Sequence, residues 1–158
     1  MKPVLVCFDG SEDAAAAIRY AGELFAGRDA LVLSVATRAK DEVSLDPVSD
    51  LVGRFSGLYA DWDQAVAELA ERQARRGCEL ATEAGLLARP LAASGKPAAT
   101  ILHTADEHDA CAIVLGSGAQ TRLGSAFGSV VARVVHGADR PVLVVPAAKQ
   151  PGSEPESA

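Results

Sequence analysis

The chain has 158 residues, of which 49% are hydrophobic, and a formal net charge of −6. This length suits one domain with a sizeable core, and the hydrophobic content excludes a disordered chain. The negative charge argues against nucleic acid and anionic membrane surfaces as partners, because clustered Lys and Arg side chains normally bind both.

Cysteine usage and the N-terminal sequence indicate the compartment. Cys7, Cys78 and Cys111 are far apart, form no C-x-x-C pair, and have no histidine at metal-ligand spacing. We therefore expect neither a disulfide framework nor a metal site, and a reducing environment. The N-terminus has no signal-peptide pattern, and no apolar run reaches about 18 residues. These features predict a cytoplasmic protein.

Apolar runs alternate with segments of helical periodicity along the chain. In chain order we predict a strand at 4–8, a helix at 12–26, a strand at 31–35, a long helix at 58–80, a strand at 86–92, a helix at 96–107, a strand at 112–115, a helix at 130–136 and a strand at 142–145. Four of the five apolar runs are nearly continuous, which is typical of strands covered on both faces.

This alternation predicts an α/β fold: a five-stranded parallel sheet with right-handed crossovers and helices on both faces. Pro90 has no N–H for a central ladder, so the third strand should lie at an edge, and the order 3-2-1-4-5 satisfies this. In that order the chain reverses direction between strands 1 and 4. Ligands of open α/β sheets bind beyond the carboxyl ends of strands at such a point.

Two segments lack periodicity. Residues 37–57 contain several acidic residues and are expected to form a mobile flap or to be partly helical, and a lid over a site is one hypothesis for them. The tail 147–158 is rich in Pro, Ser and Glu and should be flexible, which leaves 1–146 as the folded domain.

Two loops should meet at the reversal point. Asp9-Gly10-Ser11 follows the first strand, and Gly116-Ser117-Gly118 follows the fourth. Asp9 either accepts hydrogen bonds from an adenine amino group or a ribose hydroxyl, or caps amides of its own turn. Ser11 precedes a run of helix formers and is expected to be the helix N-cap.

A second glycine pair suggests a phosphate site. Gly128-Ser129 follows Gly118 after nine residues and opens the fourth helix. Glycines let the main chain approach an anion, and a helix start supplies amide donors, here including that of Val130. The Ser129 hydroxyl is expected to cap this helix or to bind a phosphate oxygen, and the two roles are compatible. No Walker pattern occurs, and Thr121 stands where a dinucleotide fingerprint needs glycine.

These residues resemble those of the universal stress protein family over nearly the whole chain. The resemblance rests on VLVCFDGS, LVLSV, GKPAATIL and LGSGAQTRLGSAFGSVVARVVHGADRPVLVVP. The ATP-binding subgroup of that family has the pattern G-2x-G-9x-G-[S/T]. Gly118, nine residues and Gly128-Ser129 fit it, but only Ser117 separates Gly116 from Gly118, so this loop is one residue short.

The resemblance implies an adenine nucleotide as ligand: ATP first, with ADP, AMP and cyclic AMP as alternatives, and Mg²⁺ accompanying a triphosphate. By similarity, Asp9 and Val35 contact the adenine and ribose end, and the glycines with Ser129 and Val130 contact the phosphates. Arg122 either pairs with a terminal phosphate or faces solvent. The expected nucleotide site comprises Asp9, Gly10, Ser11, Val35, Gly116, Gly118, Arg122, Gly128, Ser129 and Val130.

The favoured function is a stress-response binding module or sensor rather than an enzyme. His103, His108 and His136 are scattered, and Asp106, Glu107 and Asp109 have the pattern of a solvated helix end. The alternatives are an interaction protein of the same fold that binds no nucleotide, and a slow ATPase. The apolar strand at 141–146 would expose an unpaired edge, and the resemblance points to the same strand as the interface of a homodimer.

Overall fold

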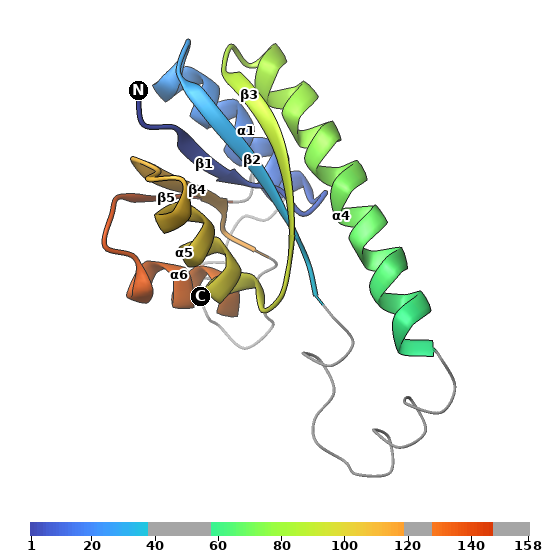
Figure 1. The fold of residues 1–158 in the computed structure, drawn as a ribbon. Helices are drawn as coiled ribbons and strands as arrows, with labels where there is room; N and C mark the ends of the chain where they lie inside the picture. The colour runs from blue at the N-terminus through green and yellow to red at the C-terminus, as the bar shows by residue number, and fades with distance from the viewer. Residues whose placement is uncertain (38–57, 119–127, 147–158) are drawn as a thin grey trace, which may run out of the picture.

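The computed structural model describes residues 1–37, 58–118 and 128–146 (Figure 1). The predicted lid segment (apart from Thr37), Arg122 and the predicted flexible tail lie outside these residues. In chain order the elements are β1 (Val4–Cys7), α1 (Glu12–Phe25), β2 (Asp29–Ala36), α4 (Leu58–Glu83), β3 (Leu87–Ser94), α5 (Pro97–Glu107), β4 (Ala112–Gly116), α6 (Ser129–Gly137) and β5 (Val142–Val145).

The strands form one parallel sheet in the order β3-β2-β1-β4-β5, which confirms the predicted fold and strand order. Pro90 lies on the edge strand β3, opposite Val32. β2 and β3 are each longer than the apolar runs that predicted them. They pair from Asp29 with Leu87 to Ala36 with Ser94, so backbone hydrogen bonding extends both strands past their apolar residues.

Helices cover both faces of the sheet (Figure 1). On β1, the side chains of Val4 and Val6 lie in the core under α1 and α4, whereas Leu5 lies in the core under α5 and α6. Ile18 of α1 packs into the first core, and Ile101 of α5 packs into the second. The alternation along each strand thus divides the apolar residues between two cores and explains why the strands are apolar on both sides.

α4 is the longest helix, with 26 residues, and its first half extends beyond the end of the sheet (Figure 1). Its second half lies close to the sheet at Gly77. A Cβ atom at Gly77 would come within 2.8 Å of the Phe8 ring and of Val32. No helix among the described residues is long and apolar enough to cross a membrane.

The acidic residues at the end of α5 form ion pairs that the sequence does not suggest. Asp106 and Asp109 are exposed, as expected, but each has a cationic partner. The Arg140 guanidinium pairs with Asp106, and Lys2 Nζ lies 2.9 Å from Asp109 Oδ1. Arg140 also donates to the carbonyls of Ala105 and Ala110, so it connects the end of α5 to the segment before β5.

Candidate functional site

A cavity of about 470 Å³ opens where the carboxyl ends of β1 and β4 meet, at the predicted reversal point. Its size falls within the usual range for small-molecule sites, about 300 to 1,000 Å³. The structure brings most of the predicted site residues to its wall. They are Asp9, Ser11, Val35, Gly116, Gly118, Gly128, Ser129 and Val130.

The loop after β1 has a defined turn. Asp9 Oδ1 accepts a 2.9 Å hydrogen bond from the Ser11 amide, so Asp9 has the local capping role that we weighed against ligand contact. Asp9 also lines the cavity, so contact with a ligand stays a prediction beside this capping role. Ser11 is the N-cap of α1 as predicted, because its Oγ accepts from the Ala14 amide at 3.2 Å.

Gly10 does not line the cavity; it faces α4. Its φ of +86° favours glycine, and a Cβ atom there would lie 2.9 Å from Gln73 Nε2. Gln73 Nε2 donates to the Asp9 carbonyl at 2.8 Å, and Gln73 Oε1 accepts from Ser34 Oγ at 3.1 Å. Sequence reasoning missed Gln73, because a glutamine within a long amphipathic helix has the pattern of a solvated face.

The glycines after β4 have different structural roles. A Cβ atom at Gly116 would come within 2.7 Å of the Asp13 backbone, so Gly116 lets β4 approach the start of α1. Gly118 has a φ of +77°, and a Cβ atom there would lie 3.4 Å from the Gly128 Cα atom. The Gly128 amide donates to the Ser117 carbonyl at 3.0 Å. The nine-residue spacing therefore separates two glycines that meet in space.

The start of α6 is suited to an anion. Gly128, rather than Ser129, is the N-cap, and no side chain from the described residues caps this helix, so the suggested capping role of the Ser129 hydroxyl is wrong. The first amides of a helix have no partner within it, and they lie at its positive dipole end. The first turn of α6 contains no acidic residue, and Ser129 and Val130 line the cavity. In contrast, α1 is capped by Ser11 and has Glu12 and Asp13 in its first turn.

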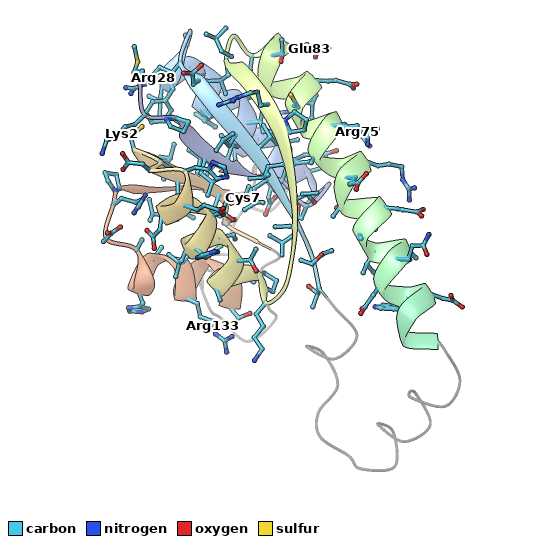
Figure 2. The ribbon with its side chains drawn as sticks, in the orientation of Figure 1. Lys2, Cys7, Arg28, Arg75, Glu83 and Arg133 are labelled. Atoms are coloured by element: carbon cyan, nitrogen blue, oxygen red, sulfur yellow. The ribbon has the colours of Figure 1, made fainter. Side chains whose placement is uncertain are left out.

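The wall nearest β2 is apolar. Leu33, Val35 and Leu115 contribute aliphatic surface, and Ile101 of α5 adds more. Cys7 also lines this part of the cavity and packs on the side of the sheet that α5 covers (Figure 2). Burial, together with the negative charge of Asp9, raises the pKa of the Cys7 thiol well above its usual range. Cys7 is therefore a neutral thiol and contributes to the apolar wall.

Asp13 is a second cavity residue that sequence reasoning did not place in the site. A carboxylate in a first helical turn is favoured by the helix dipole, so the position of Asp13 in the sequence does not by itself indicate a site. In the structure, Ser117 Oγ donates to Asp13 Oδ2 at 3.4 Å, and the Asp13 side chain lines the cavity. Within the described ranges, no group of three His, Cys, Asp or Glu side chains is placed to hold a metal ion.

The sequence matches the model of the universal stress protein family over residues 1–146. The chain belongs to this family. A comparison with curated protein sequences gave no significant match.

Solved structures of other universal stress proteins have a similar fold. UspA from Lactobacillus plantarum is 26% identical, with a TM-score of 0.68 over 91% of this chain and 97% of that one. An Archaeoglobus fulgidus member in complex with dAMP is 20% identical, with a TM-score of 0.60 over 92% and 98%. A member in complex with cAMP is 25% identical, with a TM-score of 0.57 over 91% and 96%.

Proposed function

We propose that this universal stress protein binds an adenine nucleotide in the cavity between β1 and β4 and acts as a binding module or sensor in the stress response. Occupancy is the proposed mechanism. A nucleotide that contacts the loop after β1 and the start of α6 holds these two segments together and so changes a surface that a partner protein reads. We place this activity in the cytoplasm.

The polarity of the cavity is the observation that supports this proposal. At one end, the start of α6, which has no side-chain cap among the described residues, and the facing glycines Gly118 and Gly128 offer amide donors with little side-chain bulk. At the other end, aliphatic side chains form an apolar wall beside the Asp9 carboxylate, which can accept hydrogen bonds from an amino or hydroxyl group. An adenine nucleotide has groups that match these two ends in order: an anionic phosphate, a hydroxylated sugar and a flat base with an amino group.

The solved relatives with dAMP and cAMP support adenine as the base. ATP is the ligand that the family resemblance favours. Mg²⁺ would then be held by the phosphate oxygens, water and at most one or two carboxylates, as is usual for this ion.

Equilibrium binding of adenine nucleotides tests this proposal, with Gly128→Val as the blocking variant. Gly128 has a φ of −63°, and a Cβ atom there would lie no nearer than 3.7 Å to the other described residues, which leaves room for a side chain on that side. The branched methyl groups would occupy the space proposed for the phosphate. Val135→Ala is the matched control, because Val135 is exposed on the same helix and lies outside the cavity. Equal binding by wild type and Gly128→Val would contradict the proposal.

The shortened spacing between Gly116 and Gly118 favours a second candidate, an interaction protein of the same fold without a nucleotide. Thermal unfolding separates the two. A ligand at 100 times its dissociation constant should stabilise the fold by about 2.7 kcal/mol, whereas an unbound nucleotide leaves the melting temperature unchanged. A slow ATPase would instead release phosphate above the buffer rate and lose this activity in Ser129→Ala.

We also propose that the protein is a homodimer through β5. β5 pairs with β4 on one side, and no other described strand covers its second edge. An apolar edge strand of this kind is usually covered, since its free N–H and C=O groups otherwise pair with other chains. A second copy of the same strand satisfies both edges at once.

A further inference from the structure

Two carboxylates are among the described groups that line the cavity. Asp9 and Asp13 both line it, and no Lys, Arg or His side chain from the described parts of the chain does so. The Asp9 carboxylate already accepts one hydrogen bond, from the Ser11 amide. Asp13 is the carboxylate that faces the glycine loop.

The position of Asp13 is set by the fold. Its backbone packs against Gly116, and its Oδ2 accepts from Ser117 Oγ at 3.4 Å. Ser117 is buried and is held on both sides: its amide donates to the Val145 carbonyl at 2.8 Å, and its carbonyl accepts from Gly128. The Asp13 charge is therefore fixed next to the glycines, at the end of the cavity where the phosphate is proposed to bind.

We infer that Asp13 is a specificity-determining residue that favours a nucleotide with a singly charged phosphodiester, such as a cyclic adenine nucleotide, over a triphosphate. This inference rests on the proposed function. The start of α6 supplies about half a positive charge, which suits one anionic group. Each further negative charge near Asp13 meets a like charge in a partly desolvated site, and this lowers affinity by roughly a factor of ten.

The test is calorimetric titration of the full chain with adenosine, cyclic AMP, AMP and ATP, all in EDTA. The variants are Asp13→Asn and, as matched control, Glu12→Gln. Glu12 lies in the same helical turn, is exposed and does not line the cavity, so this control removes the same charge from the helix start. Asp13→Ser is a second variant that retains a hydroxyl near Ser117.

Wild type should bind cyclic AMP more tightly than AMP, and AMP more tightly than ATP. Asp13→Asn should raise ATP affinity by roughly ten- to a hundredfold and AMP affinity by about three- to tenfold, with adenosine unchanged within about twofold. Asp13→Ser should show the same graded increase, and Glu12→Gln should change each affinity by less than about threefold.

Two results would overturn the inference and leave the proposed function intact. One is an equal change of affinity for all four ligands in Asp13→Asn and Asp13→Ser, which would show a steric effect. The other is weaker ATP binding by these variants than by wild type when Mg²⁺ replaces EDTA. This would show that the Asp13 carboxylate is a metal ligand and does not select ligands by repelling their charge. Failure of wild type to bind any of the four ligands would overturn both the inference and the proposed function.

Discussion

Gln73 Nε2 donates a 2.8 Å hydrogen bond to the carbonyl oxygen of Asp9, and this bond joins α4 to the loop between β1 and α1. The same side chain accepts from Ser34 Oγ, which is 1% exposed and lies on β2. One amide therefore connects three elements beside the cavity. This arrangement makes the long helix part of the site's support, although no residue of α4 lines the cavity.

Gln73→Leu should destabilise the fold and weaken nucleotide binding together. The change leaves the Ser34 hydroxyl and the Asp9 carbonyl without their partner, at a cost of about 1 to 3 kcal/mol. Urea unfolding measures the stability, and calorimetry measures the binding. Ser34→Ala is the control: it removes only the bond to β2, so it should affect stability while nucleotide affinity stays within about twofold. Wild-type affinity in Gln73→Leu would show that the bond to Asp9 does not position the loop.

The fold was predictable because few residues decide it. Continuous apolar strands require helices on both faces, and Pro90 restricts β3 to an edge, so alternation and one proline favour a strand order that ends in β3. The glycines and Asp9 indicated the position of the cavity, because glycines in a loop and a polar residue after a strand can be recognised from the sequence alone.

Sequence reasoning missed one residue beside the cavity, Gln73, and one residue on its wall, Asp13, because both depend on tertiary contacts. Gln73 and Asp13 occupy helical positions whose sequence context explains them locally, one as a surface residue and the other as a favourable charge at a helix start. Only the packing of α4 and β4 against the loop after β1 brings these side chains to the site. The N-cap of α6 was uncertain by one residue, which is typical of helix boundaries read from sequence.

Arg140→Met should destabilise the protein by about 2 to 4 kcal/mol, because charged hydrogen bonds to two carbonyls are lost. The Arg140 side chain is 15% exposed and donates to the Ala105 and Ala110 carbonyls at 2.7 and 2.9 Å. Arg133→Met is the control, since Arg133 is exposed on α6 (Figure 2) and should change stability by less than about 0.5 kcal/mol. Equal midpoints of the two variants in urea would contradict this role.

Gly116→Ala and Gly128→Ala should differ sharply in stability. A Cβ atom at Gly116 meets the Asp13 and Ala14 backbone at 2.7 to 2.9 Å, and this backbone can move only with α1. The expected loss is about 1 to 3 kcal/mol. At Gly128 the nearest atoms of the described residues lie 3.7 Å from such a Cβ, so Gly128→Ala should fold with nearly unchanged stability. Denaturant midpoints measured side by side decide this; similar losses would show that Gly116 is not a packing position.

Cys7 should make stability fall with pH above about 9. Burial raises the pKa of the folded thiol above the ordinary value of 9.0, so the unfolded chain loses this proton first. The stabilisation is full below the unfolded pKa and is lost as pH rises toward the folded pKa, with a slope of about 1.4 kcal/mol per pH unit. In Cys7→Ala, the unfolding free energy should decline less steeply between pH 9 and 10. Parallel pH profiles of the two proteins would refute the assignment.

The proposed homodimer makes a prediction about one strand edge. The amides of Ile113 and Ser117 donate to the carbonyls of Pro141 and Val145, so alternate residues of β5 bond to β4. In a parallel ladder the intervening residues point their N–H and C=O groups the other way, which places the Val144 amide on the free edge. Val144→Pro removes this outward donor and leaves the bonds to β4 in place. Light scattering should then give a dimer for wild type and a monomer for Val144→Pro, with similar circular dichroism. A monomeric wild type, or a variant that stays dimeric, would place the interface elsewhere or exclude it.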